Sequence, residues 1–369
     1  MQTPTIRQFL ALLRAGLWQQ PVDESCFAGA APDWEALYRM ASDQTVCGLV
    51  FDGINALPPH LYPPAGWVMR WCASAVRIEQ ANERVDRALA ALSAFYRERG
   101  VCPVLLKGQG VARLYPEPGH RQCGDIDLYL GAHYGRAKQL LRAGGFRLGS
   151  EGEKHVDYAF GGVAVENHRH VAVLYHPGRN RRFQRWAAAW MAEKGPVCSI
   201  KDEEVLLPPP GFNAVYLLVH ALLHFIPEGI GLRQVCDWAR LLYVCRASID
   251  RERLCREVRA LGLEEAFVTF GYVAVRHLGL PPECVPFRLE GAEGAGEFLL
   301  DDILQGGNFG HARPVNRLRQ EGGWATHWHN YRAIRSRCRA MRVFCRAEAR
   351  WYPYFRAWNW LKKKLRGLD

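Results

Sequence analysis

Two aspartates separated by one residue, Asp125 and Asp127, are the residues of this sequence best suited to bind a metal ion. On a β-strand, residues i and i+2 point to the same side, so their carboxylates lie about 6.5 Å apart along the strand. Hard divalent cations such as Mg²⁺ or Mn²⁺ take carboxylate ligands, whereas two such charges without a cation repel each other. The alternative is an edge strand with two aspartates in water.

The residues before this pair are suited to bind phosphate. The run K-G-Q-G at 107–110 ends an apolar segment and precedes a short helical segment, and Arg121 lies four residues before Asp125. A glycine turn into a helix start exposes backbone N–H groups, and Lys107 and Arg121 would balance phosphate charge. Carboxylates combined with phosphate oxygens are typical of magnesium in phosphoryl transfer. Glu166, in the run V-E-N-H, is the candidate third carboxylate of a two-metal site.

Short strands are expected to position these residues. The apolar run V-C-P-V-L-L-K at 101–107 predicts a strand, and residues 123–130 alternate, which predicts a strand with one polar face. Residues 163–174 alternate again and place Glu166 and His168 on one face. A helix is expected over 134–143, followed by a further strand-like stretch.

Helical spacing dominates the remainder of the chain. It predicts helices over 6–18, 34–57, 67–97, 215–225, 232–244 and 251–261, and an ordered glycine-rich loop over 300–312. We therefore expect an α+β protein with four parts. These are a helical N-terminal region (1–98), an α/β core (99–205), a helical subdomain (206–310) and a basic aromatic C-terminal tail (311–369).

Composition narrows the class of protein. The 369 residues are 49% hydrophobic, which is ample for a buried core, and the longest apolar stretch, 215–226, is too short to span a bilayer. The N-terminus has no signal-peptide pattern, and the twelve cysteines form no C-x-x-C pair, so we expect a cytoplasmic protein with reduced thiols. An attachment to the membrane surface stays open.

The basic excess belongs to the tail. Residues 311–369 hold 15 basic and 3 acidic residues, whereas the rest of the chain is nearly neutral. The tail also holds five of the twelve tryptophans. Basic and aromatic residues together favour an amphipathic helix packed on the body, an anionic membrane surface, or contact with a nucleic acid.

Other motifs weigh less. His220 and His224, at i and i+4, share a helix face, and packing or a role facing the substrate is preferred to a zinc site because no third ligand is evident. Arg233 and Asp237 are most simply an ion pair on a helix surface. The chain lacks a P-loop, and the run that starts at Gly108 has an arginine where a dinucleotide fingerprint needs its third glycine.

The run L-L-K-G-Q-G-V-A-R-L-Y-P-E-P-G-H-R-Q-C-G-D-I-D-L-Y-L resembles the core of the uncharacterised nucleotidyltransferases of the DNA-polymerase-beta-like superfamily. The run is more distantly similar to AbiEii-type toxin transferases. V-E-N-H, H-A-L-L-H-F, G-L-R-Q-V-C-D-W-A-R-L-L and G-G-N-F-G extend the resemblance over roughly residues 30–312.

The resemblance implies a polymerase-beta-like core, a small mixed sheet with flanking helices, that binds a nucleoside triphosphate through Mg²⁺ or Mn²⁺. An acceptor hydroxyl would attack the α-phosphate and pyrophosphate would leave. The resemblance assigns roles to seven residues: metal binding and catalysis to Asp125, Asp127 and Glu166, and contact with the triphosphate to Lys107, Gly108, Gln109 and Arg121.

Two other functions remain open at this stage. Many superfamily members have Gly-Gly or Gly-Ser where this chain has Gly108-Gln109, so a member that binds a nucleotide or a partner without turnover is one alternative. A D-x-D glycosyltransferase, with Asp125 and Asp127 binding a nucleotide-sugar through manganese, is the other. The acceptor, which could be a small molecule, a protein or RNA, and the oligomeric state do not follow from the sequence.

Overall fold

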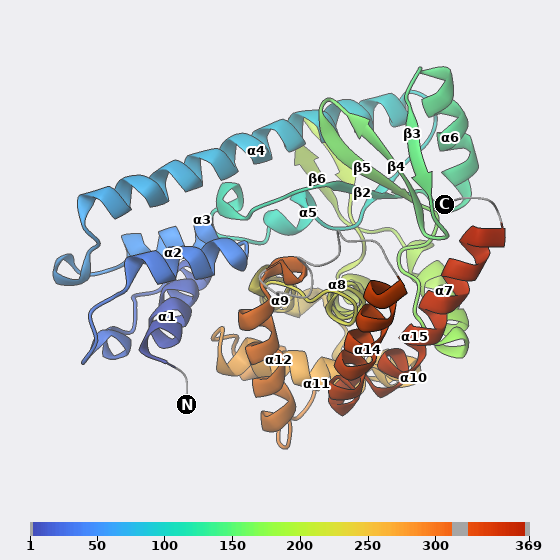
Figure 1. Cartoon of the computed structure of the whole chain (residues 1–369). Coiled ribbons are helices and arrows are strands. Elements are labelled where there is room, and N and C mark those ends of the chain that lie inside the picture. The colour runs from blue at the N-terminus through green and yellow to red at the C-terminus, as the bar shows by residue number, and fades with distance from the viewer. Residues whose placement is uncertain (1–2, 312–323, 366–369) are drawn as a thin grey trace.

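The N-terminal region is helical, as its apolar spacing predicts (Figure 1). The computed structural model describes residues 3–311 and 324–365. Helices α1 (Pro4–Trp18), α2 (Trp34–Asp43), α3 (Cys47–Asn55) and the long α4 (Ala65–Arg97) follow one another. The single helix predicted over 34–57 is wrong, because α2 ends at Asp43 and Thr45 adopts a φ of +56°, which no α-helix accommodates.

Among the described residues, seven strands form one mixed sheet in the order β3-β4-β5-β2-β1-β7-β6. The strands are β1 (Val104–Leu105), β2 (Ile126–Tyr129), β3 (Leu148–Glu151), β4 (His155–Phe160), β5 (Val163–His168), β6 (Val197–Ile200) and β7 (Glu203–Leu206). β2 pairs in parallel with β5 and antiparallel with β1, so it lies inside the sheet. Its polar face is therefore not the face of a solvated edge strand.

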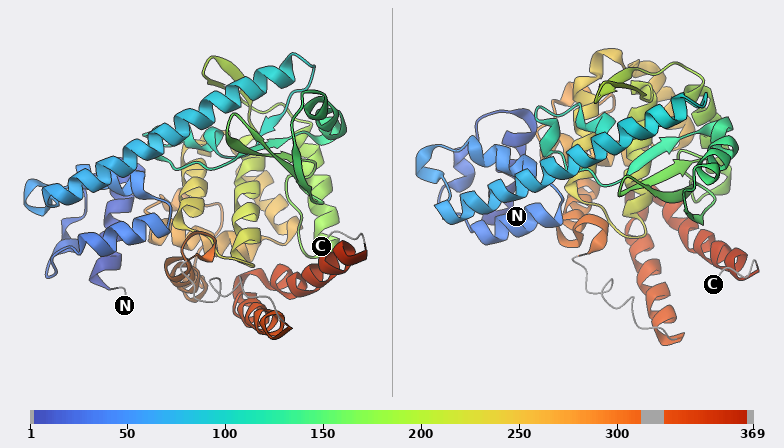
Figure 2. Two further views of the ribbon diagram at one scale, coloured as in Figure 1. Left: turned by 45° about the horizontal axis from the view of Figure 1, so that its top comes forward. Right: turned by 90° about the horizontal axis from the view of Figure 1, so that it is seen from above.

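Helices cover both faces of the sheet (Figures 1 and 2). Apolar residues of α4 and of α6 (Tyr134–Ala143) pack against strand residues such as Ile126, Leu128 and Val165 in one hydrophobic cluster. These strand residues alternate with Asp125, Asp127 and Glu166, which consequently point to the opposite face. That second face is turned toward α8 (Pro210–Phe225). The short α5 (Gln109–Ala112) begins directly after Lys107-Gly108.

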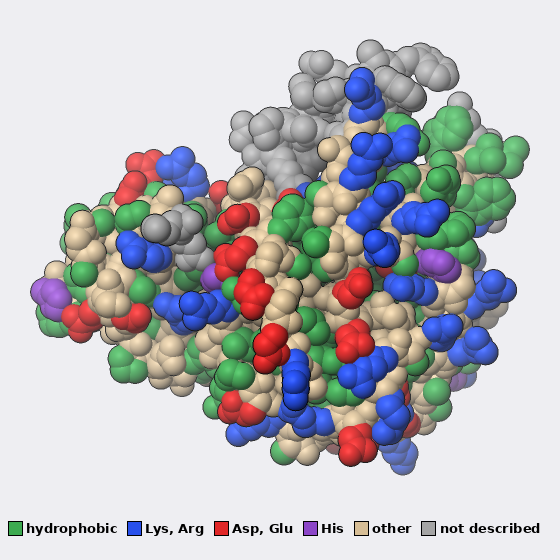
Figure 3. Space-filling view, turned by 90° about the horizontal axis from the view of Figure 1, so that it is seen from below, with side chains coloured by type: hydrophobic (Ala, Val, Ile, Leu, Met, Phe, Trp, Pro, Cys, Tyr) green, Lys and Arg blue, Asp and Glu red, His purple; other side chains and the backbone are tan. Residues whose placement is uncertain are grey.

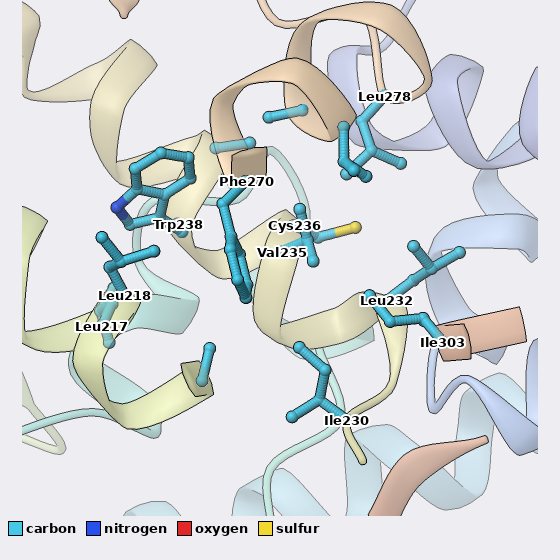
Figure 4. Close-up of a cluster of buried hydrophobic side chains, with 14 of the residues drawn as sticks. Leu217, Leu218, Ile230, Leu232, Val235, Cys236, Trp238, Phe270, Leu278 and Ile303 are labelled. Atoms are coloured by element: carbon cyan, nitrogen blue, oxygen red, sulfur yellow. The ribbon is translucent and has the colours of Figure 1, made fainter. Parts of the chain in front are cut away.

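The second helical part is built on one large core. Figure 4 shows buried side chains of α8, α9 (Leu232–Val244), α11 (Glu264–Arg276) and α12 (Glu293–Gly306), among them Leu218, Val235, Trp238, Phe270 and Ile303. The same cluster includes residues of α1 and α3, so the N-terminal helices and this part share a core. α7 (Pro177–Met191) and α10 (Arg251–Leu261) complete it.

The predicted loop over 300–312 is wrong in its first half, because α12 continues to Gly306 before the turn at Asn308–Gly310. In the tail, α14 (Trp324–Ala340) and α15 (Arg342–Leu365) are helical, whereas residues 312–323 and 366–369 lie outside the described part. None of the described helices combines the length and the hydropathy that crossing a membrane requires.

Candidate active site

Three carboxylates converge on the face of the sheet that is turned toward α8. Asp127 on β2 lies directly opposite Glu166 on β5, because the two strands pair in parallel with these residues in register. Asp125 precedes β2 by one residue. One carboxylate oxygen from each of the three residues lies within 4.8 Å of the others. The sequence predicted these three residues as one group, and the structure brings them together.

We call Asp125, Asp127 and Glu166 together the carboxylate group, and Lys107 lies against it. Its Nζ is 2.8 Å from Oδ2 of Asp127 and 3.5 Å from Oδ2 of Asp125, and the side chain is 17% exposed. Burial lowers the pKa of Lys107, but Asp127 and Asp125 outweigh burial and raise it above its ordinary value. Burial raises the pKa of Asp127, yet Lys107 and His168 hold it well below its ordinary value. Lys107 and Asp127 are therefore charged at neutral pH.

Three further residues surround Glu166, and none of them was predicted from the sequence to belong to the site. Nε2 of His168 lies 3.0 Å from Oδ1 of Asp127 and 3.2 Å from Oε2 of Glu166. From β4, Nδ1 of His155 lies 3.1 Å from Oε2 of Glu166, and Nζ of Lys154 lies 3.9 Å from it. Burial raises the pKa of Glu166, but the hydrogen bond from His168 and the charges of Lys154 and His155 lower it overall.

His155, Glu166 and His168 also place one ligand atom each within 4.8 Å of the others. The sequence signal that could have found His155 is the alternation in H-V-D-Y-A-F. This run forms β4, which pairs with β5, the strand of Glu166, after the turn at Gly161-Gly162. This pairing places His155 opposite His168.

Asp125 and Glu166 line a cavity of about 440 Å³, a volume typical of small-molecule sites. The core contributes Lys107, Gly108, Asp125, Lys154 and Glu166 to its lining. The opposite side comes from α8, α9, the break between α2 and α3, and the turn after α12. The cavity therefore lies between the sheet and the helical parts, and its wall includes Thr45, Leu217, His220, His224, Arg233, Gln234, Asn308 and Phe309.

Gly108 forms the turn before α5, whereas the side chain of Gln109 lies outside the cavity. Gly108 adopts a φ of +63°, which glycine tolerates best, and α5 starts directly after it. The side chain of Gln109 points away from the cavity, because its amide donates to the backbone oxygen of Asn82 and to the carboxylate of Asp86 on α4. Any contact of Gln109 with a phosphate would therefore use its backbone N–H.

Arg121 is held by a buried partner. Its Nε and Nη2 donate to the two carboxylate oxygens of Asp237 at 3.0 and 2.6 Å, and the hydroxyl of Tyr115 donates to the same carboxylate at 2.7 Å. Arg121 is 4% and Asp237 6% exposed. A phosphate would have to compete with this pair for the guanidinium.

The ion pair expected between Arg233 and Asp237 on a helix surface is wrong, because Asp237 is buried and binds Arg121. Arg233 instead donates through Nη1 to the backbone oxygen of Gln122 at 2.6 Å. Its Nε has no hydrogen-bond partner among the described residues, and Arg233 lines the cavity. Arg233 is thus a better-placed guanidinium for an anion than Arg121.

His220 and His224 face the cavity from α8. Their ring centroids are 4.5 Å apart, and neither belongs to a group of three converging metal ligands in the described part of the chain. Burial, and the nearby charge of Lys107, lower the pKa of His220 well below its ordinary value and that of His224 to about 4. Both imidazoles are therefore neutral at pH 7, and the arrangement favours a role facing the substrate.

Comparison with known proteins identifies a family that the chain matches. A family model described as uncharacterised nucleotidyltransferase matches residues 30–279, which include the carboxylate group, Lys107 and the helices α8 and α9. No curated protein and no solved structure matches the chain.

Proposed function

The chain belongs to the family of uncharacterised nucleotidyltransferases, and from this premise we propose that it moves a nucleoside monophosphate from a nucleoside triphosphate to a hydroxyl acceptor. The reaction would require a divalent cation, Mg²⁺ or Mn²⁺, and would release pyrophosphate. The observation that carries the proposal is the convergence of Asp125, Asp127 and Glu166 beside Lys107 in a cavity.

The residues present fit a divalent cation. Three carboxylates that offer oxygen atoms within 4.8 Å of one another are the donor set that hard cations prefer. Asp125, Asp127 and Glu166 would hold the metal. When bound, the metal would neutralise phosphate charge and stabilise the attacking and the leaving oxygen of an in-line displacement.

The protein side chains supply the remaining functions. Lys107 and Lys154, with Arg233 across the cavity, would neutralise the triphosphate and orient its α-phosphate. Glu166, whose lowered pKa keeps it ionised, would accept the proton of the acceptor hydroxyl. The acceptor oxygen would form a bond to the α-phosphorus while the bond from this phosphorus to the bridging oxygen breaks, and pyrophosphate would leave with that electron pair.

The two alternatives have less support. A member without turnover was suggested by Gln109, but the side chain of Gln109 points to α4 and leaves the carboxylate group unobstructed. A D-x-D glycosyltransferase needs several strands that bind its donor before the D-x-D, whereas the described residues before β1 form helices. The acceptor stays open among small molecules, proteins and RNA.

Thermal unfolding tests the proposal. A nucleoside triphosphate with Mg²⁺ or Mn²⁺, at about 100 times its dissociation constant, is expected to add roughly 2.7 kcal/mol to the free energy of unfolding, a rise of several degrees in Tm. The variant Asp125→Asn/Asp127→Asn should lose this rise, whereas Asp301→Asn, on the exposed side of α12, should keep it.

Other outcomes would contradict the proposal. A rise with nucleotide-sugars and none with triphosphates would support the glycosyltransferase. No rise with any nucleotide, or an equal rise in the double variant, would contradict the proposed metal and triphosphate site.

A further inference from the structure

Four rings follow one another along the helical side of the cavity. Tyr216, His220 and His224 are spaced by four residues on α8, and their successive ring centroids are 6.0 and 4.5 Å apart. The ring of Phe309, from the turn after α12, continues the series 5.4 Å from His224. We call Tyr216, His220, His224 and Phe309 the ring wall. Three of its members, His220, His224 and Phe309, line the cavity.

These cavity-lining rings present an uncharged, partly accessible surface. His220, His224 and Phe309 are each half-buried, and they border the same cavity as the carboxylate group. Two neutral imidazoles and a phenyl ring offer flat faces that carry no charge. Such a surface suits a flat ring better than it suits a phosphate, because the phosphate would gain no charge partner there.

The turn that holds Phe309 is constrained. Gly307, Phe309 and Gly310 have φ values of +64°, +53° and +65°. A bulky residue at positive φ is unusual, and such strain persists where the surrounding structure fixes it, often at ligand sites. The side-chain nitrogen of Gln234 donates a hydrogen bond to Oδ1 of Asn308 in this turn at 3.1 Å, which connects the turn to α9.

The amide of Gln234 offers a polar contact beside the ring wall. Gln234 is 7% exposed and lines the cavity, and its amide oxygen has no hydrogen-bond partner among the described residues. A buried polar atom left without a partner costs free energy, which a ligand that donates an N–H would recover. The edge of a nucleobase carries such donors.

We propose that the ring wall, with Gln234, is the subsite for the nucleobase of the donor nucleotide, while the carboxylate group and the lysines bind its triphosphate. The base would stack on Phe309 and His224, and its edge would face the amide of Gln234. This inference rests on the proposed function, because it divides one cavity between the two ends of one nucleotide.

Comparing a nucleoside triphosphate with inorganic tripolyphosphate tests the subsite, because only the first carries a base. In calorimetric titrations with Mg²⁺, Phe309→Ala and His224→Ala should each weaken the affinity for the triphosphate nucleotide about tenfold, as expected for the loss of a stacking partner. Both should leave the affinity for tripolyphosphate within about twofold of wild type. Phe309→Tyr and His224→Phe retain a ring and should bind both ligands like the wild type.

The outcomes separate this inference from the proposed function. If the wild type binds both ligands and Phe309→Ala leaves nucleotide affinity unchanged, or weakens both ligands equally, the nucleobase subsite is wrong while the triphosphate site stands. If the wild type binds neither ligand, the proposed function itself fails. If Phe309→Ala has an altered circular-dichroism spectrum, the comparison is made with His224→Ala.

A second inference rests on the C-terminal helix α15. Five apolar residues, at spacings of three and four, lie on one side of this helix and are exposed: Trp351, Tyr354, Trp358, Leu361 and Leu365. We call them the apolar stripe. Tyr354 is 67%, Trp358 55% and Leu365 78% exposed. On the face of the molecule seen in Figure 3, a protruding group of hydrophobic side chains lies beside a band of basic ones.

The opposite side of α15 is anchored to the body. Phe344, Ala349 and Tyr352 are buried. The backbone N–H groups of Tyr175 and His176 donate to the carboxylate of Glu348 at 2.6 and 3.0 Å. The expectation that the tail packs its aromatic residues on the body therefore holds for one side of α15 and not for the stripe.

The charges of α15 favour one kind of partner. Glu348 is the single acidic residue of the sequence between 322 and 368, and it is buried. Arg346, Arg350 and Arg356 are exposed on the same helix. A second copy of this helix would bring the same positive charges against them, whereas anionic lipid headgroups would neutralise them. Tryptophan and tyrosine side chains also suit the headgroup level of a bilayer.

We infer that the apolar stripe docks on an anionic membrane surface, with the arginines in the headgroup layer. Co-sedimentation of the full chain with vesicles tests this. Binding is expected for vesicles of phosphatidylglycerol and phosphatidylcholine and to be at least tenfold weaker for pure phosphatidylcholine, or at 0.5 M salt, since the attraction is screened.

Variants locate the contact. Trp358→Ala/Leu361→Ala should weaken vesicle binding at least tenfold, whereas Met69→Ala, which removes a 72% exposed side chain from α4, should not. Equal binding of both variants, or equal binding to both kinds of vesicle, would overturn the inference. So would failure to bind vesicles together with an affinity for RNA, or with a dimer in sedimentation velocity that the double variant dissociates.

Discussion

Replacing Asp127 by asparagine is expected to lower the rate of nucleotidyl transfer on the order of a thousandfold. Asp127 is 1% exposed and joins Asp125 and Glu166 in the proposed metal site. Losing the charge stabilisation that a correctly held cation supplies costs several kcal/mol of the barrier, and each 1.36 kcal/mol is a factor of ten in rate. No other carboxylate substitution in the protein should have a larger effect on turnover.

The effect can be measured before the acceptor is identified, in an assay that offers water as the acceptor. Water in place of the acceptor hydroxyl converts a nucleoside triphosphate into the monophosphate and pyrophosphate, and chromatography quantifies the monophosphate. Asp301→Asn is the matched control, because it makes the same chemical change on an exposed helix face. If Asp127→Asn forms monophosphate at the wild-type rate, Asp127 has no role in the reaction.

The same substitution is expected to affect folding. The carboxylate of Asp127 forms an ion pair with Lys107 at 2.8 Å and lies 3.0 Å from Nε2 of His168. Without the negative charge of Asp127, the buried Lys107 has fewer counter-charges. The Tm of Asp127→Asn should therefore be measured, and the rates should be compared at a temperature at which both proteins are folded.

Breaking the pair of Arg121 and Asp237 is expected to destabilise the protein by about 3–5 kcal/mol. Asp237→Asn would leave the buried guanidinium without its charge partner and would weaken the bond from Tyr115. Urea unfolding measures the loss. Glu252→Gln, which removes an exposed i,i+4 pair with Arg256 on α10, should have a far smaller effect.

A double variant separates structure from ligand binding. Arg121→Met/Asp237→Leu removes both charges, so it should recover much of the stability that Asp237→Asn loses. If Arg121 has a structural role, the double variant binds triphosphate and Mg²⁺ as the wild type does. A folded double variant with lost triphosphate affinity would instead show that Arg121 contacts the phosphates.

Much of the candidate site could be predicted because it follows from local periodicity. Alternation placed Asp125 and Asp127 on one side of a strand, and a second alternating run supplied Glu166. Parallel pairing of these two strands then put Asp127 opposite Glu166. The helices over 134–143, 232–244 and 251–261 were predicted with the bounds that the structure has, because their apolar spacing is regular.

Contacts between distant segments were not predictable in this way. Asp237, whose carboxylate binds Arg121, is 116 residues away from it in the sequence. Arg233 was expected to pair with Asp237, but it donates to the backbone oxygen of Gln122 instead. Gln109 was expected to contact the triphosphate, but its side-chain amide donates to Asn82 and Asp86 on α4 and points away from the cavity. A single sequence gives no signal for such pairings, because they depend on how whole elements pack.

The sequence by itself determined the classes of element, the α+β composition, the carboxylates and Lys107, and the family, since each depends on residues close together in the chain. Only the tertiary structure decided what completes the site. Lys154 and His155 reach Glu166 because β4 pairs with β5, and the ring wall exists because the turn at Phe309 folds onto α8. The physical reason is that strand periodicity is local, whereas the far side of a cavity is set by the burial of apolar surface between helices distant in sequence.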